Sequence, residues 1–468
     1  MRIYNTMSKV KEELVPINGK TVQVYACGPT VYNLFHIGNA RPLCVFDVLR
    51  RYLKYRGYEV KYVQNFTDVD DKIINRAIAE GVTPLEISEN AIKEYFTDAD
   101  GLNIVKADCH PKVTENIGII IDIIQTLIDK GFAYEAGGDV YFEAAKFAEY
   151  GKLSKMPLED LRAGASERVG KPGESELKRD SMDFALWKTA KEGEPFWDSA
   201  FGKGRPGWHI ECSAMAREFL GDTIDIHGGG ADLIFPHHEN EIAQSEAATG
   251  KPLSKIWMHN EMINVDSKKM AKSKGNFFLV RDVAEAYGYE PVRFMLLAAH
   301  YRSKMNYTVG VMKAAVASLE RLYNCENAIK RVMSEKSGDE LQLGVSELIA
   351  SHKTRFIEVM DDDLNTADGI AVVFELVREI NKLLELESTT RRDITALYDA
   401  FKELTNVLGL LYAKADEAIP QEVLDLQEQR NAARKAKDFA LADELRNKIT
   451  AMGYTIEETR QGSMIRKN

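Results

Sequence analysis

Long hydrophobic runs are absent from this sequence. The apolar stretches are short, as at residues 119–121, and none approaches the ~20 residues that a helix needs to span a bilayer. The first 14 residues also lack the apolar core of a signal peptide and are charged almost from the start. We therefore expect a soluble, cytoplasmic protein with no membrane partner.

Cysteine is scarce as well. The five cysteines are odd in number and nowhere form C-x-x-C; they are Cys27, Cys44, Cys109, Cys212 and Cys325. This spacing argues against a disulfide framework and a local zinc knuckle, so reduced thiols are expected. Cys44 and Cys325 lie in predicted helices, where packing is the simplest role. Cys109 stands beside His110 but has no further ligands nearby in the sequence.

An excess of basic charge is missing too. The 61 Lys and Arg residues stand against 72 Asp and Glu residues, and the net charge of −11 excludes an overall basic coat for nucleic acid. Residues 421–468 are an exception, with nine basic and eight acidic residues. A polyanionic partner must therefore bind to a local basic region of the protein.

The sequence does have the composition of an ordinary globular protein. Hydrophobic residues make up 45% and charged residues 28%, which argues against disorder, collagen or a coiled coil as the main architecture. A length of 468 residues predicts about three or four structural units, each with a packed core.

Strand and helix patterns alternate in the first part of the chain. Four strands are predicted, at residues 21–26, 59–65, 223–227 and 256–259. Residues 41–56, between the first two strands, carry apolar side chains at helical spacing and end at Gly57, a typical C-terminal cap. A strand, a helix and a strand within about 45 residues predict a right-handed βαβ unit and a parallel sheet.

Other patterns interrupt and follow this sheet. Between the second and third strands lie an amphipathic helix at residues 116–130 and a stretch rich in Gly, Pro and charge at 164–180, which indicate an inserted domain. From about residue 311 the apolar spacing becomes helical and predicts a helix bundle. The expected fold is therefore α/β, followed by a bundle and a small C-terminal unit.

Polar or glycine-rich sequence follows each predicted strand. The clusters are residues 27–39, 65–72, 227–232 and 269–273. Because ligands collect outside the carboxyl ends of parallel strands, we expect these clusters to converge at one edge. His36–Asn39, just before a helix, could hold a phosphate, and the lysines of 269–273 could neutralise a triphosphate. Taken singly, each segment has a simpler interpretation, as a helix cap or a solvated turn.

Together these two segments, HIGN and KMAKS, resemble the signature motifs of class I aminoacyl-tRNA synthetases. Longer strings then resemble one family, the cysteinyl-tRNA synthetases; they are residues 27–32, 67–72, 207–213, 225–230, 235–241 and 362–366. The resemblance implies a Rossmann-like parallel-sheet catalytic domain with an inserted connective domain, then a helix bundle and a small C-terminal domain.

The resemblance also implies a division of the chain. The expected parts are a first catalytic half at 1–110, the connective domain at 111–200, the second catalytic half at 201–255, a stem-contact region with the lysine loop at 256–310, a tRNA-binding helical bundle at 311–418 and an anticodon-binding domain at 419–468. A G-x-G-x-x-G string at 202–207 lacks a preceding apolar strand, so it is not expected to bind a dinucleotide.

The family's zinc ion maps onto Cys27, Cys212, His237 and Glu241, an acceptable tetrahedral set. His237 and Glu241 stand four residues apart, which places them on one face of a helix. Without the resemblance, two cysteines 185 residues apart are more simply explained as buried small apolar groups. The resemblance implies that zinc accepts the substrate thiolate and excludes serine.

The remaining site residues are also implied by the resemblance. The amino acid would contact Thr67, Trp208, His227 and Asp232, although a core role for Trp208 and a loop or capping role for Asp232 are the simpler alternatives. ATP, with Mg²⁺, would bind the segments that contain His36, Gly38, Asn39, Lys269, Lys272 and Ser273. His36 and Asn39 would hold phosphates, and the two lysines would stabilise the transition state and the departing pyrophosphate.

The implied activity is ATP-dependent ligation of L-cysteine to tRNA(Cys) by a monomer. Candidate phosphate contacts in the tail are Arg430, Arg434, Lys435, Lys437, Arg446 and Lys448, which could equally form a solvated helix face. The chain departs from the family pattern at Asn39, at Ala271 and in residues 462–468, which lack an expected aromatic residue. Two alternatives stay open: a ligase that attaches cysteine to an amino sugar, and a catalytically silent tRNA-binding relative.

Overall fold

The structure is a computed structural model that describes residues 1–156, 177–265, 268–269, 278–412, 421–436, 438–459 and 462–467. The chain forms two compact units, Met1–Tyr412 and Ala413–Asn468, each described by itself. Among the described residues, none of the helices combines the length and apolar character needed to cross a bilayer.

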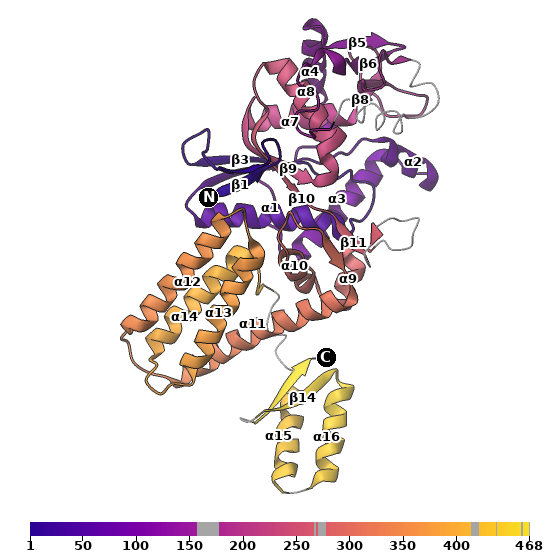
Figure 1. The fold of residues 1–468 in the computed structure, drawn as a ribbon. Coiled ribbons are helices and arrows are strands. Elements are labelled where there is room, and N and C mark those ends of the chain that lie inside the picture. Colours follow the sequence, from indigo (N-terminus) through magenta and orange to yellow (C-terminus); the bar gives the residue numbers. More distant parts are fainter. Residues whose placement is uncertain are drawn as a thin grey trace. The chain divides into compact units, whose positions relative to one another are not determined.

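A four-stranded parallel sheet forms the centre of the first unit, as predicted (Figure 1). In spatial order its strands are β10 (Ser254–Asn260), β9 (Ile224–Gly230), β3 (Thr21–Ala26) and β4 (Glu59–Gln64). Alternate side chains of β3 enter two different cores, with Val24 on the face covered by α1 (Ile37–Tyr55) and Tyr25 on the face covered by α7 (Trp208–Leu220). Both faces of the sheet are therefore buried, as parallel sheets require.

Helix α1 begins four residues earlier than predicted. His36 is its N-cap: its side chain accepts a hydrogen bond from the amide of Asn39, and the Asn39 side chain accepts one from the amide of His36. The sequence HIGN therefore supplies the cap and first turn of the helix instead of preceding it. The apolar spacing on which the prediction rested becomes regular only after Pro42, which explains the difference.

Helices and a second sheet lie between β4 and β9 in the chain. These elements are α2 (Asp71–Glu80), α3 (Pro84–Gly101), a 3₁₀ turn at Val113–Glu115, α4 (Ile117–Asp129), β5 (Ala133–Ala136), β6 (Asp139–Phe142), a 3₁₀ turn at Ala144–Lys146, β7 (Phe184–Thr189) and β8 (Gly204–Pro206), followed by α7. Strands β5 to β8 form an antiparallel sheet. The G-x-G-x-x-G string spans β8, so it does not form a strand-to-helix phosphate turn.

Short elements surround the parallel sheet. They are the hairpin β1 (Arg2–Asn5) and β2 (Val10–Glu13), the 3₁₀ turn η3 (Ala231–Leu233), the π-helical turn η4 (Ile234–His238), α8 (Glu239–Thr249), β11 (Ile263–Val265), β12 (Lys268–Lys269), α9 (Val280–Tyr287), α10 (Tyr289–Leu297) and β13 (Met305–Tyr307). Strand β11 pairs in parallel with β13 and antiparallel with β12.

Four long helices complete the first unit and confirm the predicted bundle (Figure 1). They are α11 (Val309–Glu335), α12 (Leu343–Asp361), α13 (Thr366–Leu384) and α14 (Arg391–Leu408). The apolar stripe of α13, which includes Val373 and Ile380, is buried among them. Cys44 and Cys325 are buried in the same core, in the packing role expected of them.

The second unit is small and has its own core. It contains α15 (Gln421–Lys435), α16 (Phe439–Ala451) and the hairpin β14 (Tyr454–Thr459) and β15 (Gly462–Lys467). Arg430 is 5% exposed, so the prediction that its side chain faces a phosphate is wrong. Arg434, Arg446 and Lys448 are exposed, whereas Lys437 lies outside the described residues.

The turn between α12 and α13 joins three parts of the first unit. Asp363, fully buried at a positive φ of 72°, accepts hydrogen bonds from the amide of Tyr4 at 2.8 Å, the hydroxyl of Tyr301 at 2.5 Å and Nε of Arg302 at 2.7 Å. One carboxylate thus links the N-terminal hairpin, the segment before β13 and the bundle. This turn is part of the 362–366 string found in the sequence.

Replacing Asp363 should destabilise the first unit strongly. Asp363→Ala leaves a buried hydroxyl and a guanidinium without their acceptor, at a cost of about 3 kcal/mol. Asp362→Ala is the matched control, since the exposed Asp362 pairs with Arg2 and Lys11 and surface pairs contribute at most about 1 kcal/mol. Thermal unfolding followed by calorimetry should rank Asp363→Ala well below both the control and the parent protein, and equal midpoints for the two variants would contradict this account.

An aromatic cluster supports the end of β4. The His110 ring stacks on Phe66 at 5.1 Å, its Nδ1 donates to the carbonyl of Gln64 at 2.9 Å, and its Nε2 accepts from the amide of Ala107 at 3.1 Å. These two bonds require a neutral ring. Burial lowers the pKa of His110 from 6.5 to about 4.

This pKa shift predicts a loss of stability in acid. Between pH 6.5 and about 4 the unfolded chain binds a proton at His110 that the folded chain does not. The contribution of His110 to the free energy of unfolding is therefore complete above pH 6.5 and declines as the pH falls. His110→Gln keeps a polar group but does not titrate. We expect it to lower the midpoint of thermal unfolding at pH 7.5 and to reduce the decline of that midpoint between pH 7.5 and pH 4.5. Parallel pH profiles for variant and parent would refute the assignment.

Candidate active site and metal centre

A cavity of about 490 Å³ opens at the carboxyl ends of the parallel strands. Its walls come from the segments that follow β3, β4, β9 and β10, together with the first turn of α1. The clusters after the first three strands therefore meet at one edge of the sheet, as predicted. Of the fourth cluster only Lys269 is described, as backbone in β12, and Ala271, Lys272 and Ser273 lie outside the described residues.

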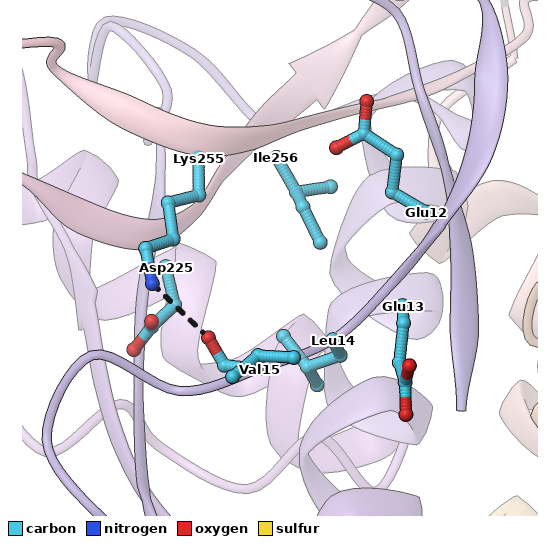
Figure 2. Close-up of a pocket in the computed structure, with 7 residues that line it drawn as sticks. All are labelled: Glu12, Glu13, Leu14, Val15, Asp225, Lys255 and Ile256. Carbon is cyan, nitrogen blue, oxygen red and sulfur yellow. Dashed lines mark hydrogen bonds between the residues drawn. The ribbon is translucent and has the colours of Figure 1, made fainter.

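A smaller cavity of about 230 Å³ lies near the amino ends of β9 and β10, against β2 (Figure 2). Two of its charged groups are held by hydrogen bonds to the N-terminal segment. Asp225 accepts the amides of Ile17 and Gln23, and Lys255 donates to the carbonyl of Val15 at 3.2 Å. This cavity is therefore part of the scaffold, and the larger cavity is the candidate site.

Four potential metal ligands gather at the base of the larger cavity. Cys27 follows β3, Cys212 lies in α7, His237 in η4 and Glu241 in the first turn of α8. Their ligand atoms all lie within 4.8 Å of one another. The Cys27 sulfur is 3.7 Å from the Cys212 sulfur and 3.5 Å from Nε2 of His237. Two thiols, an imidazole and a carboxylate in this arrangement fit a tetrahedral zinc ion.

The sequence did predict one geometric detail of this cluster. Nε2 of His237 lies 3.0 Å from a carboxylate oxygen of Glu241, as the spacing of four residues requires. A second combination, Cys27 with His227 and His238, is equally compact. Nε2 of His227, however, bonds Glu241 at 2.8 Å, whereas His238 bonds His259 through Nδ1 at 2.7 Å and keeps its Nε2 3.3 Å from the Cys27 sulfur.

The charges of the four groups are strongly coupled. A hydrogen bond from Cys27 lowers the pKa of Cys212 to about 6 in spite of burial, whereas burial raises the pKa of Cys27 well above its usual range. Burial opposes ionisation of Glu241 and His237, but charge attraction prevails. His227 and His237 hold the pKa of Glu241 well below 4.5, and Glu241 raises the pKa of His237 to about 10. A metal ion that binds here must therefore displace protons from Cys27 and His237.

Several histidines orient these groups and were not predicted to do so. His227 is fully buried, does not line the cavity and bonds the second carboxylate oxygen of Glu241. His209 contacts Nδ1 of His237 at 2.9 Å, which leaves Nε2 of His237 facing the cluster. In the sequence His209 follows Trp208, a predicted amino-acid contact, and His238 follows His237, a predicted metal ligand. This adjacency was the available signal.

The other predicted amino-acid contacts line the cavity. Trp208 is 40% exposed, so it is not a core residue, and its ring stacks on His237 at a centroid distance of 4.3 Å. Thr67 donates its hydroxyl hydrogen to Glu211 at 2.9 Å. The Thr67 hydroxyl oxygen also accepts from Nδ2 of Asn65 at 3.5 Å, which leaves one of its two lone pairs as an acceptor. Asp232 lies on the same wall, and Lys72 also lines the cavity, although the sequence did not single it out.

The predicted phosphate residues line the same cavity. His36, Gly38 and Asn39 lie at the N-terminus of α1, where the helix dipole favours an anion. Two of the first amides of the helix already have partners, since Ile37 donates to the carbonyl of Phe278 and Asn39 to the His36 ring. The cavity therefore combines a helix N-terminus with a compact group of potential metal ligands.

These features define a class I aminoacyl-tRNA synthetase. Residues 13–317 match the family described as tRNA synthetases class I (C) catalytic domain, and residues 355–412 match the DALR domain. A methionyl-tRNA synthetase from Mycobacterium tuberculosis, solved in complex with methionyl-adenylate, shares the fold, with a TM-score of 0.60 and 15% identity over 83% of this chain and 89% of that chain. A putative arginyl-tRNA synthetase from Campylobacter jejuni superposes with a TM-score of 0.57 and 12% identity over 83% of this chain and 93% of that chain.

Within this class, the sequence comparison is more specific. The cysteine–tRNA ligase of Caldicellulosiruptor saccharolyticus is 52% identical over 100% of both chains, and that of Clostridioides difficile is 52% identical over 99% of both. The chain belongs to the cysteine–tRNA ligase family.

Proposed function

We propose that this protein activates L-cysteine with ATP and transfers it to tRNA(Cys). The observation that carries the proposal is the group Cys27, Cys212, His237 and Glu241 beside a cavity that the N-terminus of α1 also lines. Full-length relatives named cysteine–tRNA ligase support the choice of substrates.

In the first step, a carboxylate oxygen of cysteine attacks the α-phosphorus of ATP, and the bond to the bridging oxygen of pyrophosphate breaks. His36 and Asn39 hold phosphate oxygens at the start of α1, where Gly38 leaves room for the nucleotide. Lys269 and Lys272, with Ser273, neutralise the charge that develops on the departing pyrophosphate. Mg²⁺ accompanies ATP.

In the second step, a hydroxyl of the terminal ribose of tRNA attacks the carbonyl carbon of cysteinyl-adenylate, loses its proton and displaces AMP. Positioning and charge stabilisation carry the rate, so the enzyme needs no covalent nucleophile. The helical bundle and the C-terminal unit supply the tRNA contacts. We expect the enzyme to act as a monomer in the cytoplasm.

The metal ligands account for the choice of amino acid. Cys27, Cys212, His237 and Glu241 would hold one zinc ion per chain, which when bound supplies a soft ligand position for the substrate thiolate that a serine hydroxyl cannot match. Asp232 pairs with the substrate ammonium, the remaining lone pair of the Thr67 hydroxyl accepts from it, and Trp208 forms an aromatic wall beside the side chain. His227 fixes the second oxygen of Glu241 and so acts through this ligand.

Cysteine-dependent exchange of pyrophosphate into ATP tests the first step. The parent protein should exchange without tRNA, should prefer cysteine to serine, and should then charge tRNA(Cys). Exchange independent of cysteine would overturn the proposal. Transfer to an amino sugar in place of tRNA would favour the alternative ligase, and absence of exchange in zinc-loaded protein would favour a silent relative.

Removal of one thiol should weaken metal binding and substrate choice together. Because Cys212→Ser replaces a thiolate by a hydroxyl, we expect zinc to be lost to a competing chelator at concentrations that leave the parent loaded, and the thiolate absorption of the cobalt-substituted protein to decrease. Preference for cysteine over serine should fall with it.

Cys109→Ser is the matched control, since Cys109 is a half-buried thiol that is not among the four grouped ligands. This variant should retain zinc and selectivity. Unchanged chelator competition in Cys212→Ser would remove this residue from the metal site.

A further inference from the structure

Arg41 is a fully buried arginine in the helix that also carries His36 and Asn39. Among the described residues, no carboxylate lies within 4.0 Å of its guanidinium. Burial lowers the pKa of Arg41 to about 10, so the group is still charged at neutral pH. The Glu261 carboxylate raises the pKa of Arg41 against the effect of burial but forms no ion pair with it, so the buried charge needs another source of compensation.

Backbone carbonyls supply this compensation from two segments that are distant in the sequence. Nη1 donates to the carbonyl of Glu261 at 2.7 Å and to that of Met262 at 3.4 Å. Nη2 donates to the carbonyl of His300 at 3.0 Å and to that of Ser303 at 2.7 Å. The planar fork of an arginine can reach all four carbonyls at once, whereas a lysine ammonium cannot.

Both segments lead directly into strands of the small sheet formed by β12, β11 and β13. Glu261 and Met262 line the cavity and connect β10 to β11, after which β12 includes the backbone of Lys269. His300 and Ser303 precede β13, the parallel partner of β11. The amide of Glu261 donates to the carbonyl of Tyr301 at 2.9 Å, so the two segments are also bonded to each other.

We propose that Arg41 is a positioning residue that sets the distance between the first turn of α1 and the strands β11 and β12, which lead to Lys269. Its guanidinium fixes the strand pair that leads to Lys269 against the first turn of α1, which presents His36 and Asn39. Because the proposed ATP contacts sit on both sides of this link, a small displacement of β11 separates groups that must act on the same triphosphate. The inference rests on the proposed function, since it assumes that both motifs bind ATP.

Arg293 provides a matched control. It is also fully buried, lies in α10 and donates to the carbonyls of Leu408 and Leu102 and to the carboxylate of Asp47. None of these partners lines the cavity. Loss of Arg293 therefore tests what a missing buried arginine does to the protein in general.

The experiment compares Arg41→Lys, Arg41→Met and Arg293→Lys with the parent in cysteine-dependent pyrophosphate exchange, with zinc content and thermal midpoint measured on the same samples. We expect the Arg41 variants to raise KM for ATP and lower kcat, with a combined loss of about 10²-fold in kcat/KM for ATP. KM for cysteine should change by less than about twofold, because the amino-acid wall is untouched. Arg293→Lys should lower the midpoint and leave both KM values unchanged.

The outcomes separate this inference from the function on which it rests. If the parent protein fails to exchange, the proposed function fails. If the parent exchanges and Arg41→Lys keeps its kinetics with ATP, or if Arg293→Lys raises KM for ATP equally, the positioning role is wrong. If both Arg41 variants fail to fold while Arg293→Lys folds, Arg41 serves the fold and has no separate role for ATP, which also overturns the proposal.

Discussion

Parallel pairing of the central strands is the constraint on which the rest of the structure depends. Strand β3 pairs in parallel with β4 on one side and with β9 on the other, so the three strands point the same way and end at the same edge of the sheet. That common edge brings Cys27 to Cys212 across 185 residues of sequence. It also brings the N-terminus of α1 and three of the four candidate metal ligands into the lining of one cavity.

Close approach of backbones at this edge limits which residues can occupy it. A Cβ atom on Gly28 would lie 1.6 Å from the carbonyl oxygen of Asn65, and one on Gly228 would lie 2.3 Å from that of Met258. The glycines that follow β3 and lie in β9 are thus needed for the strand ends to come together. The space that a Cβ atom would need is taken by neighbouring backbone and, at Gly228, by the Phe46 ring.

Buried arginines and one aspartate connect this edge to the rest of the first unit. Arg41 joins α1 to the segments before β11 and β13, and Asp363 joins the second of these segments to the helix bundle. The carbonyls of segment 300–303 therefore accept from Arg41, and its side chains donate to Asp363. The position of the cavity-lining residues Glu261 and Met262 and the attachment of the bundle depend on the same few polar contacts.

Periodicity determined the strands of the parallel sheet, α4 and the helical region, because burial on a sheet face or a helix stripe leaves a local record in the sequence. Resemblance of whole strings, in contrast, supplied the four candidate metal ligands, since nothing local relates Cys27 to Cys212. Only the tertiary structure showed that His227 bonds the Glu241 carboxylate, that Arg430 is buried and that Arg41 donates to four carbonyls. These facts depend on which backbone atoms from distant segments meet, and backbone atoms are the same in every residue.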